Sequence, residues 1–151
     1  MQYSEGSIGR IFTLKLESGD RLPDSLVAFA REHKIGCAMV MYVGGADATS
    51  RLVVGPEKDR GEDIIPIVYG LDGVHELVAM GTLFPNENGD PELHMHAAAG
   101  REGRASVGCV RAGVDVWLIG EVVLLEILGT GGFRKKDPKT GFEILQLSKT
   151  A

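Results

Sequence analysis

Alternation of apolar and polar residues predicts a chain built mostly from short strands. Residues 10–16 place alternate apolar side chains on one face, as expected of a half-buried strand. Residues 37–43 form a continuous apolar run that ends at Gly44 and Gly45, which is typical of a buried strand followed by a turn, and residues 48–54 are expected to be its hairpin neighbour. Further strand-like segments cover residues 64–69, 74–84, 92–98, 106–110, 114–128 and 144–147.

One helix is predicted after the first strand. Apolar residues recur at helical spacing from Leu22 to His33, with Asp20 as the expected N-cap, Pro23 in the first turn and Gly36 ending the pattern. A single helix among seven or eight strands indicates an α+β fold, in which the helix covers one face of a mostly antiparallel sheet.

The connections between these segments are read as turns and loops. The charged stretch 55–63 is expected to be a solvated loop. Residues 129–132 lack the lysine and the following helix of a phosphate loop, and the basic residues 134–136 run directly into Asp137 and Pro138. We therefore predict turns there, and neither a phosphate loop nor a nucleic-acid patch.

Composition places the chain among ordinary globular domains. Its 151 residues are 44% hydrophobic and 25% charged, and 21 of them are glycine, which suits many tight turns. A single domain spanning residues 1–151, with a core at about 9–147, is expected. The formal net charge of −5 provides no electrostatic attraction for a nucleic-acid backbone, so direct DNA binding is disfavoured.

No segment predicts export or membrane insertion. The amino-terminal residues have no signal-peptide pattern, and the most apolar stretch, residues 114–128, is too short and too charged to span a bilayer. We expect a cytoplasmic protein. In that compartment Cys37 and Cys109 stay reduced, which favours thiol chemistry or metal ligation over a bridge between them.

The chemistry-bearing residues gather around residues 92–96. On a strand, side chains two apart point the same way, so His94 and His96 share a face with Glu92 before them. Cys109 follows thirteen residues later, on what is expected to be the adjacent strand. Two imidazoles and a thiolate suit zinc, with the fourth position open to water, a substrate, or a carboxylate such as Glu92 or Glu121.

A simpler interpretation stands beside the metal site. A His-x-His pair on a strand can be part of a polar face or a hydrogen-bonded pair, and an isolated cysteine such as Cys109 is often a small buried hydrophobe. The spacing between the two motifs matches none of the compact zinc-finger patterns.

Glu121 is the other candidate site residue. It lies in a row of otherwise apolar side chains, where a buried carboxyl group must be protonated, hydrogen-bonded or near a cation. It could support a metal ligand, bind the metal itself, or act as a catalytic general acid or base. The alternative is an ordinary salt bridge to an arginine such as Arg111.

The order of motifs resembles the PPC domain, the plant and prokaryote conserved domain, in its stand-alone prokaryotic form. The motifs are GRIF at 9–12, ELVAMGTL at 76–83, LHMH at 93–96, GC at 108–109 and GEVV at 120–123. The resemblance implies an antiparallel sheet packed against a helix and assembly into a homotrimer. In plant nuclear proteins the domain follows AT-hook segments, and this sequence contains no AT-hook.

The resemblance also indicates which residues of this chain correspond to the family's site residues. The family's His-x-His falls on His94 and His96, its later Gly-Gly-His falls on Val107, Gly108 and Cys109, and its Glu-Val-Val begins at Glu121. Prokaryotic relatives are thought to hold a metal with such a histidine set. Here a cysteine replaces the third histidine, and thiolate is a competent zinc ligand.

Three hypotheses follow. The first is a homotrimeric zinc protein with His94, His96 and Cys109 as ligands, acting as a metal-dependent hydrolase or lyase on a small molecule. The second is a regulatory module associated with DNA through partner proteins, without an AT-hook. The third is a non-catalytic protein that binds a small ligand.

Overall fold

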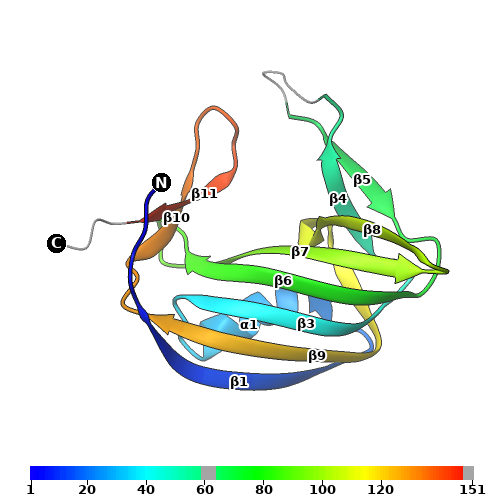
Figure 1. Ribbon diagram of the computed structural model, residues 1–151, viewed down its shortest axis with the longest axis horizontal. Coiled ribbons are helices and arrows are strands. Elements are labelled where there is room, and N and C mark those ends of the chain that lie inside the picture. Colours follow the sequence, from blue (N-terminus) through cyan, green and yellow to red (C-terminus); the bar gives the residue numbers. More distant parts are fainter. Residues whose placement is uncertain (59–63, 148–151) are drawn as a thin grey trace.

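The protein is a curved antiparallel sheet with one helix on one face and a separate hairpin beside the end of β6 (Figure 1). The computed structural model describes residues 1–58 and 64–147. Within them the large sheet has nine strands, one or two more than the sequence predicts, in the order β1-β9-β3-β6-β7-β8-β4-β5, with the short β2 also paired to β9. The α+β class is confirmed.

The first half of the chain contains the helix and five strands. Their bounds are β1 (Ser7–Glu17), β2 (Arg21–Leu22), α1 (Asp24–Glu32), β3 (Ala38–Ala46), β4 (Arg51–Pro56) and β5 (Pro66–Gly70). The second half contains β6 (His75–Pro85), β7 (Pro91–Arg101), β8 (Arg104–Cys109), the short 3-10 helix η1 (Val110–Ala112), β9 (Val114–Leu128), β10 (Gly132–Lys136) and β11 (Glu143–Leu147).

The predicted hairpin between β3 and β4 is wrong. Both edges of β3 are occupied by β6 and β9 along its whole length, so β4 pairs instead with β8 and β5. The turn predicted over residues 134–136 is also wrong, because β10 continues through them and pairs with β11. Part of the predicted loop at 55–63 lies outside the described residues, and its first two residues belong to β4.

The helix begins later than the sequence predicts. Residues 21–22 pair with β9 as β2, so they are extended and α1 starts at Asp24 with Pro23 at its N-cap. Asp20, the expected cap, accepts hydrogen bonds from the Glu17 amide at 2.9 Å and from the Ser25 hydroxyl at 3.1 Å. Its carboxylate therefore stabilises the turn before the helix and not the helix end.

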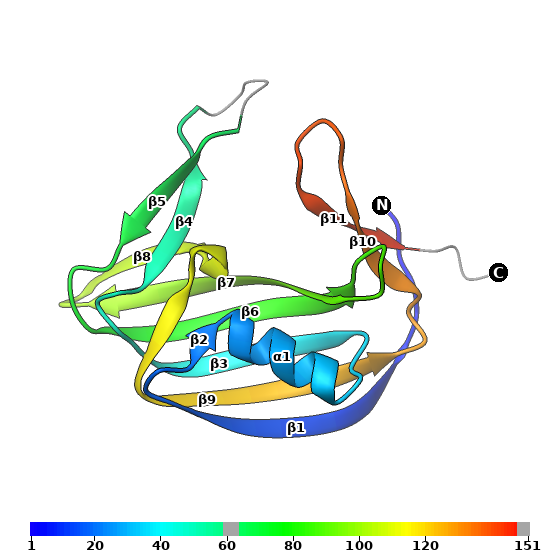
Figure 2. The same ribbon diagram turned by 180° about the vertical axis from the view of Figure 1, so that it is seen from behind.

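The hydrophobic core lies between α1 and the face of the sheet that it covers (Figure 2). Leu26 and Ala30 of α1 are fully buried there. Every second residue of the central strands points into this core, as the period of a strand requires. The buried members of β3, β6, β7 and β9 include Val40, Leu77, Leu83, Met95, Ala97, Val122 and Leu124. Each fully buried Leu or Val contributes about 1.5–3 kcal/mol relative to exposure.

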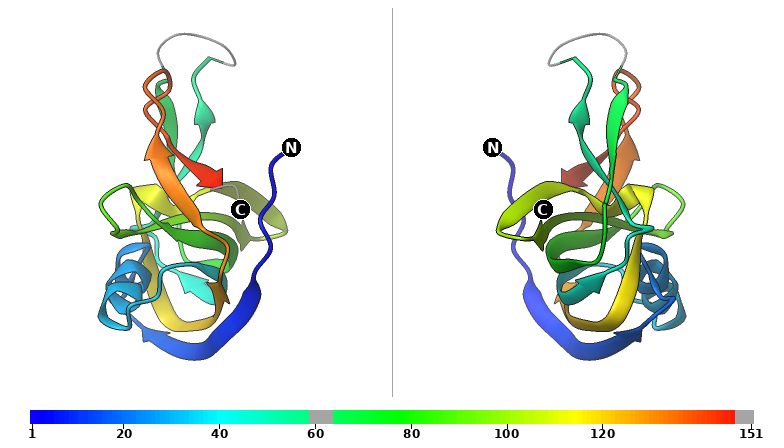
Figure 3. Two further views of the ribbon diagram at one scale, coloured as in Figure 1. Left: turned by 90° about the vertical axis from the view of Figure 1, so that its left-hand side faces the viewer. Right: turned by 90° about the vertical axis from the view of Figure 1, so that its right-hand side faces the viewer.

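The opposite side of the sheet, called the open face below, is not covered by any helix of the described part of the chain. One row of directly paired residues on this face crosses six strands, because partners in an antiparallel pair point the same way. The row is Thr13, Val123, Met41, Met80, His96 and Cys109. Two hairpins, β4–β5 and β10–β11, rise from the same side of the molecule (Figure 3).

An ion pair between the half-exposed Arg10 and the buried Glu126 joins the first strand to β9. Gly9 and Arg10 form a bulge opposite Glu126, between the paired positions Ile8↔Ile127 and Ile11↔Leu125. The Arg10 guanidinium donates to both Glu126 oxygens, at 2.7 and 2.8 Å, and the Arg10 amide donates at 3.0 Å. These bonds lower the pKa of Glu126 from 4.5 to about 2. The sequence analysis did not select Glu126, although it alternates with core residues of β9.

Replacement of Glu126 tests this ion pair. Because the folded pKa lies below the unfolded one, its stabilisation is present above pH 4.5 and is lost as the pH falls towards 2. We expect Glu126→Gln to lower the free energy of unfolding by about 2 kcal/mol at pH 7 and to flatten the loss of stability in that acid range. Urea unfolding across pH 2–7 measures both.

Glu121→Gln is the matched control. Glu121 is an exposed carboxylate on the same strand that forms no ion pair with the residues the structure describes. Its replacement should change the free energy of unfolding by less than about 0.5 kcal/mol. Equal effects of the two substitutions would contradict a stabilising role for the Arg10–Glu126 pair.

Candidate functional site

The two predicted histidines lie side by side on the open face of β7. Met95 and Ala97 point into the core, so His94 and His96 emerge together on the other side. Their Nε2 atoms are 3.2 Å apart, and the rings meet edge to face with centroids 4.9 Å apart. The strand therefore brings two imidazole nitrogens to one point, as the sequence predicts.

Cys109 lies on the neighbouring strand β8, directly opposite His96. The turn between β7 and β8 is tight, and Glu102 and Gly103 at its tip both have positive φ. This hairpin places the cysteine on the same face as the histidine pair, although its side chain is buried. The predicted adjacency of the two strands is confirmed, and both Cys37 and Cys109 are free thiols.

The histidine pair fits the geometry of a tetrahedral metal ion. Two nitrogens bound to one zinc at about 2.0–2.1 Å are separated by about 3.3 Å, close to the 3.2 Å observed. Among residues 1–58 and 64–147, no three His, Cys, Asp or Glu side chains lie close enough together to form a metal-binding group. The structure thus brings together two of the three predicted ligands and places the third on the adjacent strand.

Positive charges act on the first histidine of the pair. Burial, and then the charges of Arg134, His96 and Arg111, lower the pKa of His94. The neutral imidazole is therefore favoured, and only that form has a lone pair for a metal or a hydrogen-bond donor. The two arginines were not selected from the sequence as site residues.

Arg134 of β10 reaches this site from the carboxy-terminal hairpin. Its guanidinium donates to the backbone oxygen and the hydroxyl of Thr82, both at 3.0 Å. Thr82 lies directly opposite His94 in the pairing of β6 with β7. The folding of β10 over the end of β6 therefore puts a buried cation beside the first histidine.

Glu121 lies apart from the histidine pair within the chain. On β9 it is paired with Lys15 of β1 and Val43 of β3. Three strand spacings, about 14 Å, separate β9 from β7. Its side chain is exposed, and Arg111, the alternative partner, is stacked over Phe142.

Glu92 is closer in sequence to the histidines than Glu121 and shares their strand. Its backbone oxygen accepts a hydrogen bond from Arg134 at 3.4 Å. It is not part of a three-residue metal-binding group in the described residues.

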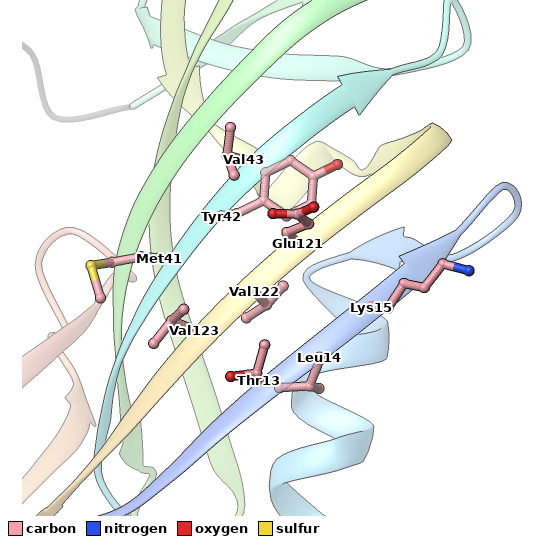
Figure 4. Close-up of a pocket in the computed structure, with 9 residues that line it drawn as sticks. All are labelled: Thr13, Leu14, Lys15, Met41, Tyr42, Val43, Glu121, Val122 and Val123. Atoms are coloured by element: carbon pink, nitrogen blue, oxygen red, sulfur yellow. The ribbon is translucent and has the colours of Figure 1, made fainter.

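A shallow hollow of about 560 Å³ lies over β1, β9 and β3 (Figure 4). Lys15 and Glu121 are the charged residues that line it, and most of the others are apolar, including Met41, Val43 and Val123. Met41 is paired with Met80, which is paired with His96, so the hollow and the histidine pair share the open face.

These features define an α+β protein with a paired-histidine site on the open face of an antiparallel sheet. The sequence profile of the Plants and Prokaryotes Conserved (PCC) domain matches residues 3–128. The chain therefore belongs to this family, and the resemblance found in its motifs is confirmed. The match ends at the last residue of β9, so β10 and β11 lie beyond it.

Solved structures share the fold at low sequence identity. A plant- and prokaryote-conserved (PPC) protein from Pyrococcus horikoshii is 22% identical, with a TM-score of 0.82 and 99% of both chains covered. A metal-containing protein from Archaeoglobus fulgidus is also 22% identical, with a TM-score of 0.80 over 97% of this chain and 99% of its own. A proposed DNA-binding protein from Bacteroides thetaiotaomicron is 18% identical, with a TM-score of 0.73 over 93% and 96%.

One curated relative matches as part of a longer protein. The bifunctional protein GlmU of a Synechococcus strain is 32% identical over 146 residues, which cover 94% of this chain. The chain spans 21% of that relative's length. Among the described residues, no helix is long and apolar enough to cross a membrane.

Proposed function

We propose that this protein is a homotrimeric zinc protein in which His94, His96 and Cys109 bind the metal. The observation that carries the proposal is the pair of imidazole Nε2 atoms, which converge to 3.2 Å on one face of β7. Cys109 supports it as the third ligand because it is the direct cross-strand partner of His96. The metal-containing protein from Archaeoglobus fulgidus shares the fold, which also supports a metal in this one.

The reaction class that fits such a site is hydrolysis or lyase chemistry on a small molecule. Zinc, when bound, supplies a Lewis acid that polarises a carbonyl or phosphoryl oxygen. The chain itself holds His94 in its neutral form through burial and neighbouring positive charge, which lower its pKa. We retain Glu121 as a proposed catalytic acid or base only for a site shared between subunits, because β9 and β7 are three strands apart.

The homotrimer is supported by the apolar character of the open face. Val43, Val78 and Met80 are 52%, 58% and 57% exposed on adjacent strands, with Val107 at 63% nearby. A contiguous apolar surface of this kind favours burial against another subunit. Closed cyclic assembly would bury it without leaving a free sheet edge.

Association with DNA is the second candidate function. Two structural neighbours favour it, because the proteins from Bacteroides thetaiotaomicron and Ralstonia eutropha are described as proposed DNA-binding proteins. The net charge of −5 opposes direct binding, so a partner protein would have to supply the contact. A cytoplasmic location remains a prediction from the sequence.

Elemental analysis tests the zinc site. Untagged protein should contain one zinc per chain, and His94→Ala, His96→Ala and Cys109→Ala should each lower the content at least tenfold, because loss of one ligand weakens a three-residue site severely. His33→Gln is the control, since His33 is an exposed histidine on the helix side of the molecule. Protein without stoichiometric metal, or with metal unaffected by the cysteine substitution, would refute the site.

The oligomeric state is tested by light scattering coupled to gel filtration. The protein should elute at three times its chain mass of 16.2 kDa, and Val43→Glu should convert it to monomers by placing a charge in the apolar interface. Glu57→Lys, at an exposed residue directly after β4, is the control for a charge change elsewhere. A monomeric parent protein would contradict the assembly.

A further inference from the structure

Arg134 carries a buried positive charge whose hydrogen-bond acceptors are all neutral. Only 3% of the residue is exposed. It donates to Thr82 and to the backbone oxygens of Glu92 and Glu143, and no described carboxylate lies within 4.0 Å of it. The more distant carboxylates of Glu92 and Glu143 offset its charge in part, while burial lowers its pKa. A buried cation without a contacting anion favours the approach of an external one.

Arg111 is a second cation whose charge, like that of Arg134, acts on His94. It lies in η1, two residues after Cys109, with its guanidinium carbon 5.4 Å from the centre of the Phe142 ring. It forms no hydrogen bond or ion pair with the residues that the structure describes. The ring holds the side chain in position, and the planar fork of N–H groups suits an oxyanion.

These arginines and histidines are linked in a ring by strand pairings, neighbouring chain positions and side-chain contacts. His94 is paired with Thr82, which binds Arg134. Arg134 binds the carbonyl of Glu143, the residue next to Phe142, and Arg111 stacks on Phe142. Arg111 lies two residues after Cys109, and Cys109 is the cross-strand partner of His96. The Nε2 atom of His96 in turn lies 3.2 Å from that of His94.

We propose that this ring binds the oxyanion group, carboxylate or phosphoryl, of a small molecule. Arg111 binds the oxygens directly, and Arg134 is a positioning residue that supplies a fixed positive charge behind them. The rest of the molecule then lies against His94 and His96. The inference goes beyond the proposed function, because the arginines attract an anion whether or not a metal is bound.

A nucleic-acid backbone is a poorer occupant of this ring. Backbone recognition needs many cations spread along a groove, and the neighbouring Lys135 is already paired with Glu87 at 3.5 Å. Two arginines whose charges both act on His94 match a single small anion better than a repeating phosphate chain.

Calorimetric titration of chelator-treated protein tests the proposal. Inorganic phosphate and succinate are titrated separately at constant ionic strength maintained with sodium chloride. We expect saturable binding of at least one of them, weakened tenfold or more by Arg111→Gln, because a charge-assisted bidentate contact is lost. Phe142→Ala should weaken it about threefold by releasing the arginine from the ring.

Arg104→Gln is the matched control, an exposed arginine on β8 at the far end of the strand from Cys109. It should leave the affinity within twofold of the parent protein. Absence of saturable binding, or equal affinity of the Arg111→Gln and parent proteins, would overturn the proposal. So would binding of a duplex oligonucleotide that depends on Arg111 while both small anions fail.

The zinc content of the same preparations, measured before chelation, separates this inference from the proposed function. Arg111→Gln should retain zinc, because its side chain is not a ligand. Anion binding without zinc in the parent protein would support the oxyanion ring and refute the metal site. Zinc in the parent protein without anion binding would support the metal site and refute the oxyanion ring.

Discussion

The register of β7 between β6 and β8 is the constraint on which the site depends. Met95 and Ala97 point into the core. Gly81 is the cross-strand partner of Met95, and it must lack a side chain because a Cβ there would lie 2.7 Å from the Met95 Cβ. Because successive residues of a strand alternate between faces, this packing also determines where His94 and His96 emerge. A shift of one residue would bury both imidazoles in the apolar core. The hydrophobic side of the sheet thus positions the polar side.

The electrostatics of the site come from parts of the chain that are distant in sequence. Arg134 binds Thr82, which lies 52 residues earlier in the chain. Arg111 of η1 stacks on Phe142, the residue directly before β11. The carboxy-terminal hairpin therefore forms one wall of the site beside the sheet. An acidic protein, with a net charge of −5, in this way places two arginine charges where they act on His94. Such a local field acts over short distances even when the net charge is of the opposite sign.

The elements that the sequence predicts well are those whose signal is local. Alternation located β6, β7 and β9 within a few residues, and the spacing of two placed His94 and His96 on one face. Cys109 was expected on the next strand, and the tight turn at Glu102 and Gly103 places it there. The position of β4 could not be predicted in this way, because it depends on which strands already occupy the edges of β3. The helix start failed for the same reason, since the pairing of β2 with β9 overrides the capping preference of Asp20.

The buried charges were harder to predict than the strands. Glu121 attracted attention because its neighbours at alternate positions are apolar, yet that row faces outward in the single chain, while Glu126 lies on the core side with Arg10. Which face of a two-sided apolar strand is covered depends on where the only predicted helix packs, and no local pattern encodes that. Arg134 was read as part of a turn because residues 134–136 run directly into Asp137 and Pro138, whereas β10 continues through them and pairs with β11.

The family profile ends at the last residue of β9, and this boundary bears on how the site can change during evolution. The conserved domain profile stops at residue 128, whereas two groups that surround the histidine pair, Arg134 and Phe142, come from the hairpin beyond it. Among the described residues, that hairpin pairs with the rest of the chain at one bridge, Asn86↔Arg134, and otherwise with itself. Exchange or divergence of this short appendage could therefore alter what the histidines encounter while the sheet that carries them stays intact. Homologues with the same central scaffold can in this way acquire different chemical preferences.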